Sequence, residues 1–252
     1  MLREAAAMVL IRDADRHGIE VCMLRRVAKS SFAASAFVFP GGAVDKGDSE
    51  ANWTDYFIDS GVSLLDKLAT TYKIAAIRET FEEAGIMVAG FPDSIEISAE
   101  QRALLNQGQA SFQDILNANQ LKINLKEVLF YDHWITPVGA PIRFDTRFFI
   151  AVAQAEQTVL HDNQETDLSR WASPAEFLEL YDKKEVKLMP VTHVQLERLS
   201  RFKSVEAVLK ATHKEPVCEP TLPVLTYDEG GKPFSVKIAL REGAVEYPVF
   251  LK

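Results

Sequence analysis

The sequence R-E-T-F-E-E-A-G-I, residues 78–86, is the most informative stretch of this chain. Apolar residues recur at near-helical spacing between residues 72 and 84, and this spacing predicts a helix over Tyr72–Ala84. Gly85 follows at the position where helices commonly end, because glycine readily adopts the left-handed backbone conformation found there. The stretch is therefore expected to form the last turns of one helix that packs on an apolar layer.

Three glutamates of this helix are expected to share one face. Residues at i, i+3 and i+4 are neighbours on a helix surface, so Glu79, Glu82 and Glu83 project together. Their like charges repel, and Arg78, four residues before Glu82, can pair with one of them. Carboxylate clusters suit Mg²⁺ or Mn²⁺, which polarise phosphate groups and lower the pKa of a bound water. The cluster indicates phosphoryl transfer to water; an ordinary solvated helix face is the alternative.

A tight loop precedes this helix in the sequence. Residues 5–12 and 20–25 are short, apolar and β-favouring, and they predict a pair of strands. A third short strand enters F-V-F-P-G-G, residues 37–42, where one proline and two glycines follow one another. Such a loop lets the backbone approach a ligand closely.

The loop and the helix together resemble the signature of the Nudix hydrolases. That signature reads Gly, five residues, Glu, seven residues, then Arg-Glu-aliphatic-x-Glu-Glu-x-Gly-aliphatic. Its second half is matched by Arg78, Glu79, Glu82, Glu83, Gly85 and Ile86, with Thr80 in place of the aliphatic residue. Gly42 matches the first glycine, and Asp48 stands where the family has glutamate. Residues 49–77 separate the two halves, 29 residues instead of seven, so 22 extra residues split the signature.

The resemblance implies roles for these residues. Glu79, Glu82 and Glu83 would bind Mg²⁺ or Mn²⁺, with the Gly42 carbonyl as a further ligand. Glu82, Glu83 and Arg78 would take part in catalysis, Arg78 by orienting a ligating carboxylate. Asp48 is one methylene shorter than glutamate and adjoins the insertion, so a role in the site and no such role both stay open.

The split signature resembles a subgroup that includes the mammalian peroxisomal coenzyme A-hydrolysing Nudix enzyme. The subgroup shares with this chain residues on both sides of the insertion and further on: Asp45, Asp48, Ser49, Trp53, Trp134, Thr136, Pro137, Arg143, Phe144, Asp145, Thr146, Phe149, Leu222 and Pro223. Coenzyme A or an acyl-CoA is the substrate that this resemblance implies. A dinucleotide of the ADP-ribose or NAD(H) type is the alternative substrate, and a nucleotide-binding module with little catalysis is the alternative function.

Further candidate residues follow from the same subgroup. Glu165 stands six residues before Trp171, as a glutamate does in the subgroup, and is the candidate general base or extra metal ligand; an ordinary acidic loop residue is the alternative. Arg26 and Lys29 precede the Gly-Gly loop and are candidates for phosphate contact, or solvated charges. Arg26 matches the first arginine of a basic motif in the coenzyme A-active enzymes, and Ser31 stands at the second.

Arg143 and Asp145 recur together in the subgroup and are candidates for binding substrate or supporting the site. A structural ion pair between them on one strand is the alternative.

The remaining segments complete the expected fold. Strands are predicted at 86–88, 127–136 and 142–154, helices at 98–107 and 111–118, a helical zone at 174–213 broken near Pro190, and short strands towards the C-terminus. We expect an α+β fold, the Nudix α/β/α sandwich with a mixed sheet. Residues 1–252 would form a single domain, with an insertion at 49–71 and a helical and short-strand C-terminal extension at 174–252.

The composition limits the classes of partner. The chain has 252 residues, 47% of them hydrophobic, and a net charge of −8. An acidic surface argues against nucleic acid and anionic membranes, whereas a bound divalent metal still allows a small-molecule nucleotide substrate. The N-terminal apolar run is too short to span a membrane, and we expect a cytoplasmic protein with Cys22 and Cys218 as buried free thiols. Family resemblance implies a homodimer.

Overall fold

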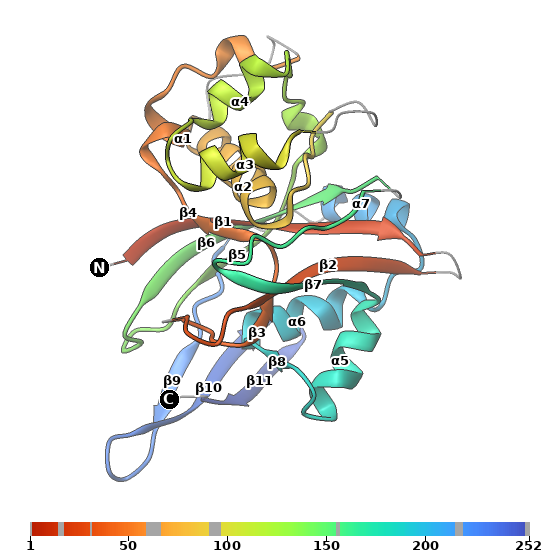
Figure 1. Cartoon of the computed structure of the whole chain (residues 1–252). Helices are drawn as coiled ribbons and strands as arrows, with labels where there is room; N and C mark the ends of the chain where they lie inside the picture. Colours follow the sequence, from red (N-terminus) through yellow and green to blue (C-terminus); the bar gives the residue numbers. More distant parts are fainter. Residues whose placement is uncertain are drawn as a thin grey trace.

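A curved mixed β-sheet lies between two layers of helices in the computed structural model of the chain (Figure 1). The structure describes residues 2–14, 18–30, 32–58, 67–90, 97–154, 157–214 and 219–249. The strands are β1 (Leu2–Asp13), β2 (Ile19–Arg26), β3 (Ala36–Val38), β4 (Gly41–Ala43), β5 (Leu129–Ile135), β6 (Arg143–Val152), β7 (Thr166–Ala172), β8 (Lys187–Leu188), β9 (Val224–Tyr227), β10 (Pro233–Leu240) and β11 (Gly243–Pro248).

The helices fall into two groups that cover the two faces of the sheet (Figure 1). They are α1 (Lys46–Glu50), α2 (Lys67–Ala84), α3 (Ala99–Asn106), α4 (Phe112–Ala118), α5 (Pro174–Asp182), α6 (Pro190–Leu199) and α7 (Val205–Lys214). Short 3-10 helices lie at Thr54–Tyr56 and Leu125–Glu127. The layered α+β architecture with its mixed sheet confirms the fold expected from the sequence.

Strand β1 is buried on both faces and organises the two cores. Successive side chains of a strand point to opposite faces, so alternate residues of one strand enter different cores. Ala6, Met8 and Leu10 pack with α2, α3 and α4. Ala7, Val9 and Ile11 pack with α5, α6, α7 and the small sheet β9–β10–β11. The unbroken apolar run at the start of the sequence is thus explained by burial on two sides.

The edges of β1 position the glycine loop. One edge pairs in parallel with β6, from Leu2 opposite Arg143 to Ile11 opposite Val152. On the other edge β1 pairs with β2 near its end and with β4 nearer its start, all antiparallel. Strand β4 therefore fills the gap where β2 diverges from β1, and it carries Gly41 and Gly42 directly beneath α2.

Two local expectations need correction, and one strand was not predicted. Residues 86–88 do not form a strand; they are buried, and Gln157 rather than a neighbouring strand donates to the Met87 carbonyl (3.1 Å), so burial alone explains their apolar character. Strand β7 was not predicted, because its side chains are mostly polar and its pairing with β2 uses only backbone groups. Helix α2 begins at Lys67, five residues before the predicted start at Tyr72.

The other predicted strands and helices lie within a few residues of their expected positions. Cys22 is a buried free thiol, whereas Cys218, Ser31 and part of the 49–71 insertion lie outside the described residues. No helix in the described ranges is long and apolar enough to cross a membrane. The division into one domain with an insertion and an extension stays a prediction.

The core on the α2 side predicts a clear contrast between two phenylalanines. Phe149 is 1% exposed and its ring meets the edge of Phe130 at 5.8 Å, whereas Phe234 is 53% exposed. Phe149→Ala should lower the free energy of unfolding by about 3–5 kcal/mol, because it leaves a cavity. Phe234→Ala should change it by no more than about 0.5 kcal/mol. Urea unfolding of both variants checks this, and similar losses would contradict the assigned core.

Candidate active site

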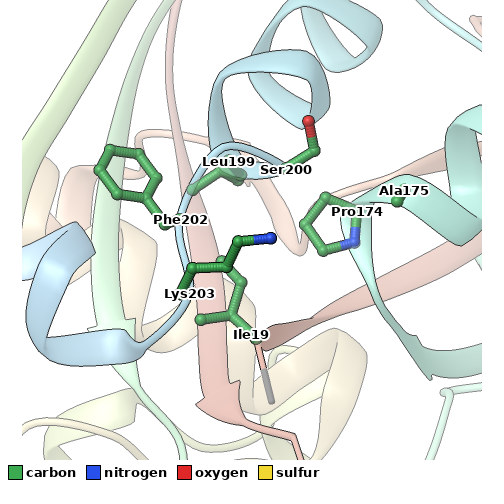
Figure 2. Close-up of a pocket in the computed structure, with 8 residues that line it drawn as sticks. Ile19, Pro174, Ala175, Leu199, Ser200, Phe202 and Lys203 are labelled. Atoms are coloured by element: carbon green, nitrogen blue, oxygen red, sulfur yellow. The ribbon is translucent and has the colours of Figure 1, made fainter.

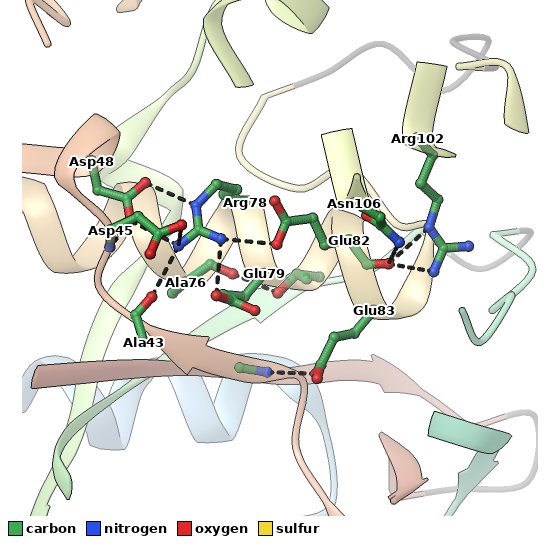
Figure 3. Close-up of polar contacts among 12 residues, drawn as sticks. Ala43, Asp45, Asp48, Ala76, Arg78, Glu79, Glu82, Glu83, Arg102 and Asn106 are labelled. Carbon is green, nitrogen blue, oxygen red and sulfur yellow. Dashed lines mark hydrogen bonds and ion pairs between the residues drawn. The ribbon is translucent and has the colours of Figure 1, made fainter. Parts of the chain in front are cut away.

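Arg78 is the centre of a buried cluster of acidic side chains on α2 (Figure 3). Its Nη1 donates to Glu79 Oε1 (2.9 Å) and to Glu82 Oε2 (2.8 Å). Its Nη2 donates to the Ala43 carbonyl at 3.0 Å, which ties the helix to β4. The predicted pairing of Arg78 with Glu82 is confirmed, and the guanidinium also holds a second glutamate and the backbone of the glycine loop.

Asp48 completes this cluster from the other side of the insertion. It accepts from Arg78 Nε at 2.9 Å and from Arg78 Nη2 at 2.8 Å, a two-pronged ion pair, and its side chain is only 1% exposed. Asp48 also accepts from the backbone N–H of Asp45 (2.8 Å), which caps the short helix α1. The structure thus brings Asp48 into the cluster, where it fixes the arginine.

The two glycines of β4 lie directly against the carboxylates of α2. The Gly41 N–H donates to Glu83 Oε2 at 2.9 Å. A Cβ added to Gly42 would lie 2.6 Å from Glu79 Oε2, and one added to Gly41 would lie 2.5 Å from the Ala6 carbonyl oxygen. A side chain at Gly41 would therefore meet the backbone of β1, whereas one at Gly42 would displace the Glu79 carboxylate.

The environment of the glutamates opposes their ionisation. Burial, partly offset by Arg78, raises the pKa of Glu79 to about 8, and burial also raises the pKa of Glu82. Burial and the neighbouring charge of Glu79 raise the pKa of Glu83 well above its ordinary value, against the Gly41 N–H. Burial would lower the pKa of Arg78, but its acidic partners outweigh burial and raise it. The glutamates outnumber the cation beside them, so an additional cation would stabilise their charged forms.

The donor set suits a hard divalent cation. It consists of carboxylates and backbone carbonyls on one helix face and one loop, and oxygen ligands of this kind favour Mg²⁺ or Mn²⁺. In the described parts of the chain, no three His, Cys, Asp or Glu side chains converge into a ready metal cage. Arg78 lies between Glu79 and Glu82, and Glu83 faces Gly41, so a cation would have to draw these side chains together.

Arg26 and Glu165 lie beside this cluster. Arg26 Nη2 is 3.7 Å from Glu165 Oε2, and both residues influence the charge of Glu83 electrostatically. The loop carrying Glu165 is held by Asp162, whose carboxylate accepts from the backbone N–H groups of residues 164–166 at 2.9–3.2 Å. Lys29 is exposed in the turn after β2. The sequence did not single out Asp162, although an Asp before a polar turn is a usable signal.

Arg143 and Asp145 lie on β6, which pairs with the edge of β1 opposite to that occupied by β4. Arg143 donates from Nε to the Thr136 carbonyl (3.0 Å). Asp145 lies 2.5 Å from His133 Nε2 and 3.6 Å from Arg147 Nη1. Arg143 and Asp145 therefore have separate partners, and the alternative of an ion pair between them is wrong. Their role towards substrate stays a prediction.

Two side chains of α3 hold the end of α2 and were not expected from the sequence. Arg102 donates from Nε (3.0 Å) and Nη2 (2.7 Å) to the carbonyl of Glu82, and Asn106 Nδ2 donates to the same oxygen at 3.2 Å. Nothing in the local sequence signals this contact, because it depends on how α3 packs against α2.

A recess on the opposite face of the sheet has different chemistry. It has a volume of about 180 Å³ and is lined by residues of α5, α6 and the adjoining loops, with Lys203 and Ser200 as its polar side chains (Figure 2). None of its lining residues is a carboxylate, so it has no donor set comparable with that on α2.

Comparison with known proteins agrees with this arrangement. A Nudix hydrolase from Alicyclobacillus acidocaldarius has a similar structure, with a TM-score of 0.73 and 27% identity over 83% of this chain and 96% of that one. The fold is thus that of the Nudix hydrolases. Residues 59–199, more than half of the chain, match the model of the NUDT19 Nudix domain, so the chain belongs to that family and is a Nudix pyrophosphohydrolase.

Curated relatives agree with the family. The acyl-coenzyme A diphosphatase NUDT19 of Xenopus laevis is 27% identical over 260 residues, covering 84% of this chain and 68% of the relative. The enzyme of the same name from Gallus gallus is 28% identical over 263 residues, covering 84% and 70%. The sequence resemblance to the split-signature subgroup is therefore confirmed.

The two loop glycines should respond differently to alanine. In Gly42→Ala the new methyl displaces the end of a flexible side chain, so stability changes by no more than about 1 kcal/mol. Because the Glu79 carboxylate moves, turnover should fall about 100-fold. Gly41→Ala meets backbone and should chiefly destabilise the protein. Steady-state rates and urea unfolding check this, with Gly47→Ala, which points into open space, as the control. Full activity in Gly42→Ala would contradict the site.

Proposed function

We propose that this enzyme hydrolyses the pyrophosphate linkage of coenzyme A or an acyl-CoA in a metal-dependent reaction. The observation that carries the chemistry is the buried Arg78 cluster, in which carboxylates from both halves of the split signature meet beside Gly42. The names of the frog and chicken relatives support the substrate. A small nucleotide derivative is the substrate class, and nucleic acid is not proposed.

Each residue of the cluster has a role in this proposal. Glu79, Glu82, Glu83 and the Gly42 carbonyl would hold Mg²⁺ or Mn²⁺, which when bound neutralises phosphate charge and acidifies water. Arg78 orients Glu82, and Asp48 fixes Arg78 in turn. Residues that orient ligands in this way commonly matter nearly as much as the ligands themselves.

The reaction forms one bond and breaks one. The oxygen of a water molecule bonds to one phosphorus, and the bond from that phosphorus to the bridging oxygen breaks. The bridging oxygen leaves with the other phosphate, and a base takes the proton of the water. We propose Glu165 as that base, because its side chain is 63% exposed to water yet lies 3.7 Å from Arg26 at the edge of the cluster.

Basic side chains beside the cluster are proposed to bind the substrate phosphates. The Arg26 side chain is 19% exposed and its charge acts on Glu83, and Lys29 is exposed three residues further along the chain. Arg143 and Asp145 are proposed to contact a more distant part of the substrate. A dinucleotide of the ADP-ribose or NAD(H) type would use the same phosphate contacts and is the second candidate substrate. A homodimer and a cytoplasmic location also stay predictions.

Removing one carboxylate at a time tests the proposed chemistry. Glu82→Gln and Glu83→Gln keep side-chain size but remove a negative ligand, so hydrolysis of coenzyme A should fall at least about 100-fold. Chelation with EDTA should abolish turnover of the unaltered enzyme, and added Mg²⁺ or Mn²⁺ should restore it. Release of monophosphate products from coenzyme A, ADP-ribose and NADH is measured by chromatography.

The control is Glu179→Gln, an exposed glutamate of α5 on the other face of the sheet. It should retain full activity. Unchanged turnover in Glu82→Gln and Glu83→Gln would overturn the metal-site assignment. Faster hydrolysis of ADP-ribose or NADH than of coenzyme A would favour the second candidate substrate.

Substituting two adjacent arginines distinguishes a specific phosphate contact from a general effect of positive charge. Arg26→Gln should raise the KM for coenzyme A at least about tenfold, since a charge-assisted contact contributes about 1.5–3 kcal/mol. Arg25→Gln is the matched control, because Arg25 pairs with Asp167 at 2.7 Å and its side chain points to the opposite face of β2. Initial-rate measurements determine the KM of each variant, and equal KM values in the two variants would contradict the phosphate contact.

A further inference from the structure

The carbonyl of Glu82 lacks a helical partner because α2 ends at Ala84, before the residue that would bond to it. Helix α2 extends to Ala84, and the Gly85 N–H closes the last turn on the Phe81 carbonyl at 2.9 Å. Gly85 then adopts φ +70°, so the chain leaves the helix and no residue four positions on bonds to Glu82. This carbonyl belongs to a residue proposed as a metal ligand, so its partner also affects the site.

Arg102 is that partner, and the geometry is specific to arginine. Two nitrogens of its guanidinium donate to the Glu82 carbonyl at 3.0 and 2.7 Å, and Asn106 adds a third donor at 3.2 Å (Figure 3). A Cβ at Gly85 would lie 3.0 Å from Arg102 Nη1. The glycine of the signature therefore both turns the chain and leaves room for the guanidinium.

The charge of Arg102 also faces the acidic groups around the site. It interacts electrostatically with Asp162, Glu83 and Glu82. Asp162 holds the loop that carries Glu165, and Leu160 of the same loop donates from its N–H to the Ala84 carbonyl at 2.9 Å. Arg102 thus lies where the end of α2, the helix α3 and the Glu165 loop meet, and a positive charge there complements the helix C-terminus.

We propose that Arg102 is a positioning residue, which fixes the last turn of α2 so that Glu82 and Glu83 are held in register with the Gly41–Gly42 loop. The inference rests on the proposed role of these two glutamates. Arg78 controls the side chains of the cluster, whereas Arg102 controls the backbone from which Glu82 and Glu83 project. The segment that supplies Arg102 follows the signature in sequence, so the signature alone does not contain a complete site.

Substitution of Arg102 tests the proposal, using measurements that would not change if the variant were only less stable. Arg102→Gln should lower kcat for coenzyme A about 10- to 100-fold and leave KM nearly unchanged. It should also weaken Mn²⁺ binding, measured by titration calorimetry without substrate, about tenfold or more. Amide hydrogen exchange should become faster at residues 79–86. Arg102→Lys keeps the charge without the paired donors and should recover part of each effect.

Arg198→Gln is the matched control. Arg198 is also a partly exposed arginine at a helix, but it pairs with the buried Asp132 at 2.9 Å on the far side of the sheet. It should destabilise the protein while leaving kcat, Mn²⁺ affinity and exchange at 79–86 unchanged below the unfolding transition. Equal losses of kcat in Arg102→Gln and Arg198→Gln would overturn the proposal. So would an Arg102→Gln variant with unchanged Mn²⁺ affinity and unchanged amide hydrogen exchange at 79–86. If Glu82→Gln loses turnover and Arg102→Gln does not, the positioning role of Arg102 is wrong and the proposed function is unaffected.

Discussion

The buried ion pair between Arg78 and Asp48 is the interaction on which the site depends. Burying a guanidinium is costly unless its donors find partners, and here Asp48, Glu79, Glu82 and the Ala43 carbonyl accept from it. Removing Arg78 would leave Asp48 as an unpaired charge that is 2% exposed, together with repelling glutamates. The arginine therefore specifies how the loop side and the helix side of the site meet.

This ion pair explains how the signature tolerates a long insertion. The entropic cost of closing a loop grows only slowly with its length. Extra residues between Asp48 and Arg78 therefore destabilise the fold little if both ends of the loop are fixed independently. They are fixed: β4 by its pairing with β1, and α2 by the core beneath it. The described start of the insertion packs against this core, with Trp53 and Phe57 buried in it. Trp53 Nε1 donates to the Gly47 carbonyl at 3.1 Å, and Gln113 Nε2 donates to the Asn52 carbonyl at 2.8 Å.

The sequence predicts best what depends on local periodicity. The helix that carries the glutamates, the strands around residues 5–12 and 142–154 and the break at Pro190 follow from spacing and backbone chemistry within a few residues. Residues 86–88 were wrongly predicted as a strand and strand β7 was not predicted, for opposite reasons. The first has the composition of a strand but is buried without pairing, and the second pairs with β2 although its side chains are mostly polar. Local composition cannot distinguish burial from backbone pairing.

The candidate site shows the same division. The three glutamates and Arg78 share one helix, so their proximity follows from helical geometry, whereas Asp48 came into question only through its place in the signature. The contacts of Arg102 depend on packing between two helices, whereas Asp162 accepts from residues 164–166 of its own loop, a local turn that an Asp before polar residues can signal. Each acts on backbone groups, a helix carbonyl in one case and loop N–H groups in the other. Since every residue has a backbone carbonyl, the sequence around Glu82 carries no signal for its partner, and only the packing of α3 against α2 determines that Arg102 holds this group.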